Sequence, residues 1–112
     1  MTLISVVETD TYLARARRLM NEAEREAVVT MVAANPLAGD LVPGSGGLRK
    51  LRIPLEGRGK RGGGRVIYWF HAMNLPAVLL FVFAKNEASD VTPEQARALA
   101  RAAENLALDF KG

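Results

Sequence analysis

Seven positive side chains lie close together in the middle of this 112-residue chain, and their types and spacing could carry chemistry. They are Arg49, Lys50, Arg52, Arg58, Lys60, Arg61 and Arg65. Glu56 is the one acid among them, so residues 49–65 carry +6 (seven minus one), whereas the whole chain carries +3. The other residues therefore sum to −3, and this uneven distribution predicts a localised anion-binding face, with a solvated basic loop as the alternative.

Clustered cations suit chemistry on a phosphodiester. Lysine and arginine can stabilise the charge that develops on the non-bridging oxygens, and arginine does so with two parallel hydrogen bonds. Neighbouring cations also make it easier for a lysine to give up its proton, so Lys50, Lys60 or Lys85 could act as base or acid. For each of these lysines, a phosphate contact with no chemical role is the alternative.

Other kinds of active site find little support in the residue types. The absence of cysteine excludes disulfides, thiolate metal sites and thiol nucleophiles. A catalytic triad would need the single histidine, His71, which falls late in a predicted strand where a packed or partly exposed histidine is the simpler interpretation. Gly57, Gly59 and Gly62 match the G-x-G-x-x-G pattern of dinucleotide-binding loops. Such a loop must lead into a helix whose N-terminus binds the pyrophosphate, whereas a strand is predicted to follow here. We therefore predict neither a cofactor nor a metal.

The sequence predicts that the elements that position the cations are β-strands. From Leu48 the pattern has period two, so Leu51 and Ile53 should point to one face and Lys50 and Arg52 to the other. Residues 65–72 and 78–84 flank a turn-like M-N-L-P and predict an antiparallel hairpin whose second strand is central. Within the first of these strands, either Tyr68 or Trp69 could stack on a base while the other joins the core, although both could be core residues.

Helices are predicted on both sides of these strands. After an opening strand at 3–7, Thr9 or Asp10 can cap a helix over 11–20 whose outer face carries Arg15, Arg17 and Arg18. Asn21 and Glu24 begin a second helix that ends near residue 34. A Pro/Gly-rich surface loop follows, and the sequence T-P-E-Q from residue 92 begins a closing helix. The apolar stripe of this helix is predicted to be Ala96, Leu99, Ala103, Leu106 and Phe110. The chain thus predicts one α+β domain over 1–112, in the order β-α-α-β-β-β-α.

The N-terminal stretch has no basic region ahead of an apolar one, and the longest apolar run, A-V-L-L-F-V-F-A, is too short to span a bilayer. Together with the absence of cysteine, this predicts a cytoplasmic protein that does not contact membrane.

The motifs G-G-L-R-K, the glycine-separated cations before R-V-I-Y-W, and K-N-E resemble the RelE/HigB superfamily of toxins from type II toxin–antitoxin modules, in particular its HigB-like branch. The resemblance covers nearly the whole chain and implies a RelE-like fold. It also implies a ribosome-dependent mRNA interferase that cuts mRNA in the ribosomal A site without a metal, by attack of the 2′-hydroxyl on the neighbouring phosphate. The partner it implies is a cognate antitoxin, HigA-like with a helix-turn-helix domain, through which alone the toxin would reach operator DNA.

The resemblance also assigns roles to individual residues. The catalytic set it implies is Lys50, Arg52, Arg65 and Lys85. RNA contacts are expected from Arg49, Arg58, Lys60, Arg61, Tyr68 and Asn86. Asn86 stands where some relatives have a second arginine, and the tyrosine that well-known members have near the closing helix is replaced around Thr92. The identity of the base therefore stays open.

Two other functions are compatible with these residues. The first is a non-enzymatic module on the same scaffold, either a ParE-like gyrase inhibitor or a protein that only binds RNA or its antitoxin. The second is a plain single-stranded RNA-binding domain, for which the strand aromatics are few. Convergence of Lys50, Arg52 and Arg65 on one face favours the enzyme, because a module that binds only protein does not need it.

Overall fold

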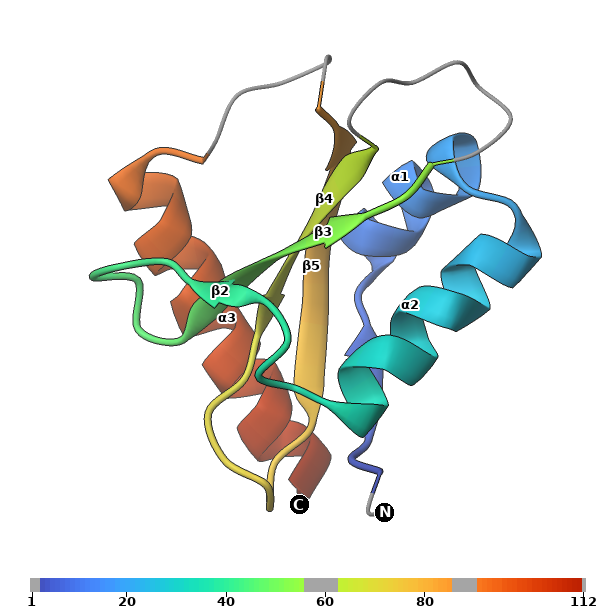
Figure 1. The fold of residues 1–112 in the computed structure, drawn as a ribbon. Helices are drawn as coiled ribbons and strands as arrows, with labels where there is room; N and C mark the ends of the chain where they lie inside the picture. Colours follow the sequence, from blue (N-terminus) through green and yellow to red (C-terminus); the bar gives the residue numbers. More distant parts are fainter. Residues whose placement is uncertain (1–2, 56–62, 86–90, 112) are drawn as a thin grey trace.

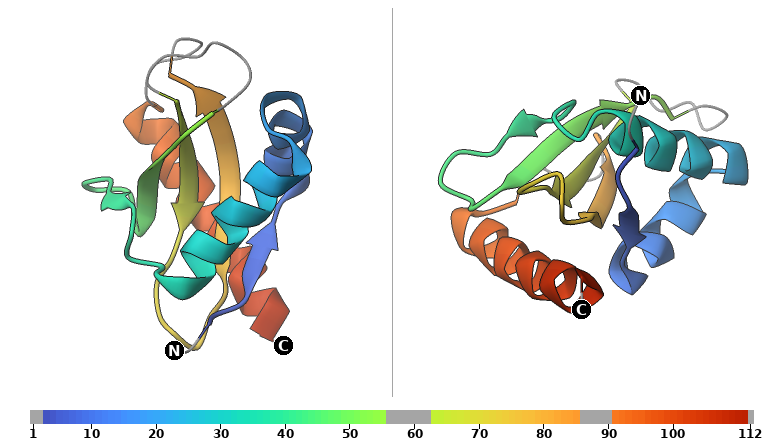
Figure 2. Two further views of the ribbon diagram at one scale, coloured as in Figure 1. Left: turned by 45° about the vertical axis from the view of Figure 1, so that its right-hand side comes forward. Right: turned by 90° about the horizontal axis from the view of Figure 1, so that it is seen from below.

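A computed structural model of the chain describes residues 3–55, 63–85 and 91–111. In this part of the chain a five-stranded sheet, ordered β1-β5-β4-β3-β2, forms the middle of three layers. Helices α1 and α2 cover one face of the sheet and α3 covers the other (Figures 1 and 2). The elements are β1 (Val6–Glu8), α1 (Asp10–Leu19), α2 (Glu22–Ala34), β2 (Asp40–Leu41), β3 (Leu48–Ile53), β4 (Gly64–Trp69), β5 (Ala77–Ala84) and α3 (Pro93–Lys111). Except for β1, which runs parallel to β5, neighbouring strands are antiparallel, so the predicted α+β fold is confirmed.

All three helices begin with the caps that the sequence indicates. The Thr9 side chain caps α1 by accepting a hydrogen bond from the third residue of the helix. Asn21 and Glu24 form a reciprocal capping box at the start of α2, and Thr92 and Gln95 bond each other's backbone N–H groups in the same way at the start of α3. These local bonds satisfy N–H groups that the first turn of a helix otherwise leaves unpaired.

The pairing of β3 with β4 assigns each side chain to one face of the sheet. Leu51 lies opposite Val66, and both belong to the core beneath α1 and α2. Leu48 lies opposite Trp69, and both belong to the second core beneath α3. Because alternate residues share a face, Lys50 and Arg52 lie on the α3 face, as the alternation predicts.

The closing helix packs through a stripe that agrees in part with the predicted one, since Ala96 and Ala103 are buried and Leu99 is partly buried against the same core. Ala96, Ala100, Ala103 and Ala107 are its buried residues. Leu106 and Phe110 are 43% and 60% exposed, so their assignment to the buried stripe is wrong. Trp69 and Phe83 on the sheet already fill the space between the two layers. Small alanines on the helix leave room for these rings, so the helix axis can lie close to the sheet. In the described part of the chain, no helix has the length and apolar character needed to cross a membrane.

The predicted surface loop contains a strand that sequence reading missed. Asp40 and Leu41 form β2, which pairs with Lys50 and Arg49 of β3. Two residues are too few to show a period-two pattern, and this edge strand is exposed. The observed order is therefore β-α-α-β-β-β-β-α.

Two glycines determine where β4 begins. Gly63 has φ +63°, and a Cβ there would lie 2.1 Å from the carbonyl oxygen of Ile53. A Cβ on Gly64 would lie 2.8 Å from the carbonyl oxygen of Phe83. The backbones at the start of β4 thus approach more closely than any side chain would allow.

We predict that Gly63→Ala lowers the free energy of unfolding by more than about 2 kcal/mol, because it adds a steric clash to left-handed backbone strain. Gly44→Ala is the matched control, since Gly44 has φ +70° but no atom within 4 Å of the added Cβ. The control should lose only about 1 kcal/mol. Urea unfolding of both variants measures the difference, and equal losses would contradict the close approach at Gly63.

Candidate functional site

Three of the predicted catalytic cations share the α3 face at neighbouring positions of β3 and β4. Arg52 and Arg65 are direct cross-strand partners, and Lys50 lies opposite Ile67. Partners of this kind have Cβ atoms about 5 Å apart, and like charges placed so destabilise each other unless an anion lies between them. Arg52 is exposed, whereas Lys50 and Arg65 are half-buried. The arrangement concentrates positive charge on one face of the sheet, as an anion-binding site would require.

The fourth cation, Lys85, follows the end of β5 beside the start of β4. Its backbone N–H donates to the Gly63 carbonyl at 3.0 Å. Lys85 comes two residues after Phe83, which is the cross-strand partner of Arg65. Its side chain is exposed. The structure therefore brings the chain at Lys85 to the same end of the sheet as Arg52 and Arg65, and the chemical roles of all four residues stay predictions.

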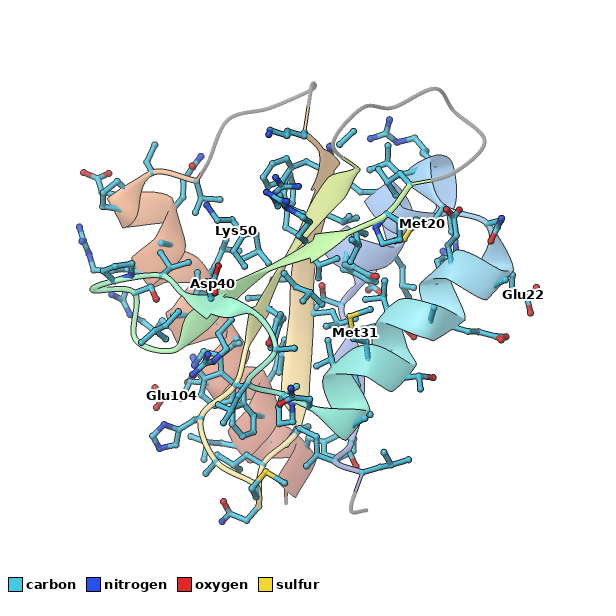
Figure 3. The ribbon with its side chains drawn as sticks, in the orientation of Figure 1. Met20, Glu22, Met31, Asp40, Lys50 and Glu104 are labelled. Carbon is cyan, nitrogen blue, oxygen red and sulfur yellow. The ribbon has the colours of Figure 1, made fainter. Side chains whose placement is uncertain are left out.

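The surroundings of the cluster differ from one cation to the next. Asp40 on β2 is the cross-strand partner of Lys50, so an acid adjoins the cluster on this side (Figure 3). Arg65 donates from Nη1 to the Gly64 carbonyl at 3.0 Å, which turns its side chain back along its own strand. A hollow of about 360 Å³ adjoins Arg52 and is also lined by Ile53, Pro54 and Gly63. The hollow thus lies directly beside one member of the arginine pair.

Arg49 lies on the other face of β3 from this cluster. It is the cross-strand partner of Tyr68, and its Nη1 donates to the Gly39 carbonyl at 2.8 Å. The guanidinium is half-buried and ties β3 to the segment before β2. The structure thus separates Arg49 from Lys50 and Arg52 and gives it a structural contact.

Tyr68 is a core residue, so the prediction that it contacts RNA is wrong. The side chain is fully buried, and its hydroxyl donates to the Pro36 carbonyl at 2.7 Å while accepting from the Gly39 N–H at 2.9 Å. Burial raises the pKa of the Tyr68 phenol. Trp69, also buried, donates from its ring nitrogen to the Gly46 carbonyl. Neither ring is available to stack on a base, because β4 lies between two strands and is covered on both faces.

The other predicted RNA contacts, Arg58, Lys60, Arg61 and Asn86, lie outside the described residues. Among the residues that are described, no group of three or more histidines and acids is placed to hold a metal ion. His71 is exposed beyond the end of β4, where its ring stacks on Trp69 at a centroid distance of 6.0 Å.

Sequence reading missed a further cation beside the sheet. Arg15 was expected on the solvent face of its helix, but it is half-buried, and its Nε donates to the Val82 carbonyl at 2.6 Å. Its guanidinium carbon lies 4.5 Å from the centroid of the Phe81 ring. A helical pattern shows which residues share a face, but it does not show that α1 runs along β5, so no signal in the sequence indicated this contact.

Comparison with known proteins gives two results. A family model described as the RelE toxin of the RelE/RelB toxin–antitoxin system matches residues 8–110. Among solved structures, the chain is similar to the Escherichia coli toxin RelE, in the form of a mutant in the free state. The two chains are 20% identical with a TM-score of 0.56, and the match covers 91% of this chain and 97% of the other. At this identity the second comparison supports the fold.

We predict that two tyrosine-to-phenylalanine variants differ in their effect on stability. Tyr68→Phe leaves the buried Pro36 carbonyl and Gly39 N–H without a partner and should cost about 1–3 kcal/mol of unfolding free energy. The hydroxyl of Tyr12 is buried with no hydrogen-bond partner, so Tyr12→Phe should be neutral or stabilising. Urea unfolding at pH 7 measures both. A stable Tyr68→Phe variant with weakened RNA binding would reinstate Tyr68 as an RNA contact.

The same variants have a second readout in the pH dependence. Burial raises the pKa values of Tyr68 and Tyr12 above the value of about 10 expected in the unfolded chain. The unfolded state therefore loses these protons first, and the stability present below pH 10 falls as the pH rises above it. Each phenylalanine variant should lose stability less steeply there than the wild-type protein.

We also predict that inorganic phosphate raises the unfolding midpoint of the wild-type protein more than sodium chloride does at equal ionic strength. The reason is that a bound anion relieves the repulsion between Arg52 and Arg65. Phosphate stabilises most proteins through exclusion from their surface, so the measured quantity is the difference between wild type and Arg65→Ala. Thermal unfolding gives this difference, and an equal phosphate effect in both proteins would contradict the site.

Proposed function

Because the chain belongs to the RelE toxin family, we propose that it is an endoribonuclease, an mRNA interferase that cuts mRNA in the ribosomal A site. Membership of this family makes the chain the toxin of a toxin–antitoxin pair. The finer proposal, ribosome-dependent cleavage without a metal, rests on the cations that the strand register gathers. It also rests on the HigB-like motifs of the sequence.

The observation that carries the proposal is the direct pairing of Arg52 with Arg65, with Lys50 on the same face. In the proposed reaction the 2′-hydroxyl gives its proton to a base as its oxygen bonds to the adjacent phosphorus. The bond from phosphorus to the 5′-oxygen breaks, and the leaving oxygen takes up a proton. The products are a 2′,3′-cyclic phosphate and a 5′-hydroxyl.

In this reaction Arg52 and Arg65 stabilise the charge on the non-bridging oxygens of the phosphorane. Lys50 and Lys85 are the candidates for moving the two protons, one at each side of the arginines. A cation cluster on a sheet face offers charge stabilisation but few groups that could shape the RNA backbone. A substrate whose backbone the ribosome already holds in place supplies that orientation, and this supports dependence on the ribosome.

We further propose the partners and location that follow from the same family. The antitoxin is expected to be a HigA-like helix-turn-helix protein that neutralises the toxin and alone contacts operator DNA. The protein is expected to act in the cytoplasm, where translating ribosomes are found.

We predict that purified wild-type protein cuts mRNA on programmed ribosomes and that Arg65→Ala slows the cleavage step at least 100-fold, because removing one preorganised charge from the transition state costs about 100- to 1,000-fold. Arg101→Ala is the matched control, since Arg101 is an exposed arginine in the middle of α3. Toeprinting detects the cut, and single-turnover assays at saturating toxin give the rate.

Thermal unfolding of each variant shows whether a slow one is folded. Two results together would contradict the enzyme proposal and favour a binding module. The first is intact mRNA on ribosomes treated with wild-type protein, and the second is an Arg65→Ala variant that is as toxic in cells as wild type. Cleavage of the same mRNA without ribosomes would overturn ribosome dependence alone.

A further inference from the structure

Arg15 bonds the outer edge of β5 beyond the point where β1, its neighbour in the described part of the chain, ends. Strand β1 pairs with β5 only from Val6 to Glu8, and the Glu8 partner is Leu79. Beyond this pairing, Thr9 donates to the Leu79 carbonyl through both its backbone N–H and its hydroxyl. Arg15, further along α1, then donates to the Val82 carbonyl at 2.6 Å. Helix α1 therefore takes the place of a longer edge strand, and this fixes the position of the Arg15 side chain.

A β-bulge directs the ring of Phe81 to the face that carries the cations. The register between β4 and β5 shifts so that Ile67 pairs with Phe81 while the next residue, Tyr68, pairs with Leu79. Leu80 and Phe81 consequently lie in succession on the α3 face, although neighbours in a regular strand alternate. Phe81 is half-buried, whereas every other residue of β5 is buried. The bulge thus leaves one aromatic ring of this buried strand partly open to solvent.

The arginine and the ring lie together, and Phe81 is on the same face of the sheet as the cations around Arg65. The Arg15 guanidinium carbon is 4.5 Å from the centroid of Phe81, and the rings of Phe81 and Phe83 are 6.1 Å apart. Phe83 is in turn the cross-strand partner of Arg65. The pairing therefore leads from Arg52 and Arg65 across the sheet to the buried Phe83, and from there along β5 to Phe81 and Arg15. The partly exposed ring of Phe81, with a guanidinium over it, thus lies two residues along β5 from the strand partner of Arg65.

Single-stranded RNA offers a partner for each of the two groups, since its phosphates suit the arginine pair and its flat bases suit the guanidinium over the ring. A guanidinium lying over an aromatic ring presents its outer plane, and bases stack on such planes in RNA complexes. The contact with the Val82 carbonyl needs only one donor, which a lysine could supply. Arginine at this position also places a planar group over a partly exposed ring, which a lysine would not.

We propose that Arg15 and Phe81 form an RNA-binding subsite for the nucleotide next to the cleaved phosphate, whose base stacks on the Arg15 guanidinium that Phe81 holds in place. The subsite rests on the proposed function for the identity of its ligand. Its role is binding, whereas the chemistry belongs to the cluster around Arg65.

The test measures binding separately from cleavage. Ribosomes are programmed with an mRNA that carries one 2′-deoxynucleotide at the cleaved position, which removes the attacking hydroxyl. Arg15→Ala should weaken the dissociation constant of the toxin for these ribosomes roughly tenfold, the effect expected for loss of one stacked base. Cleavage of all-ribose mRNA at saturating toxin should change less than threefold. Arg18→Ala, an exposed arginine on the same helix, should bind as wild type does.

Two further variants separate the subsite from a structural role. Arg15→Lys keeps a charge and a donor but lacks the plane, and Phe81→Leu keeps an apolar side chain but lacks the ring, so both should also bind at least fivefold more weakly. If Arg15→Ala fails to fold, Phe81→Leu still tests the subsite, because this variant keeps the hydrogen bond from Arg15 to the Val82 carbonyl. Wild-type binding by Arg15→Lys and Phe81→Leu would overturn the proposal, as would a lower unfolding midpoint of Arg15→Ala with unchanged binding.

Failure of the proposed function gives a different result. Wild-type protein would then leave all-ribose mRNA intact, while the dissociation constants for the deoxy-substituted mRNA would still support or overturn the subsite.

Discussion

The register between β3 and β4 is the constraint on which the fold and the candidate site both depend. Each strand has one apolar face beneath α1 and α2, so Leu51 must pair with Val66 and Arg52 with Arg65. A slip of one residue would move every side chain of one strand to the opposite face and bury arginine in the apolar core. The burial of the leucine and valine therefore fixes the position of the cations. The close approach of Gly63 to the Ile53 carbonyl holds the same register at the open end of the two strands.

The second requirement is to cover β5, which is apolar at nearly every position and must be shielded on both faces and along its edge. Helix α3 shields one face through alanines, and α1 shields the other through Tyr12, Ala16 and Leu19. Because β1 is only three residues long, α1 must also bond the exposed carbonyls of the β5 edge. The helix that completes the core thereby brings Arg15 to the face where the strands bring Arg65.

The features that the sequence predicted correctly are those that depend on residues close together in the chain. Helix caps such as Asn21 with Glu24 need only residues three apart, and the alternation around Lys50 and Arg52 needs only one strand. Contacts between distant segments carry no such signal. The burial of Tyr68 depends on bonds to Pro36 and Gly39, some thirty residues away, and the bulge at Phe81 arises only where two strands meet. The prediction of Leu106 and Phe110 as buried residues of α3 is wrong for the same reason, because the sheet determines which side of the helix packs against it.

The pairing of Arg52 with Arg65 also links the stability of the fold to anion binding, because a bound anion should stabilise the folded protein. Two like charges held opposite each other raise the free energy of the folded protein, and an anion between them lowers it again. Hydrophobic burial holds the pair in place, since relaxing the repulsion would require moving Leu51 and Val66 out of the core. The cluster is thus organised before its ligand arrives, which is the condition under which fixed charges stabilise a transition state most strongly. Any anion that occupies the site should therefore both stabilise the fold and compete with RNA.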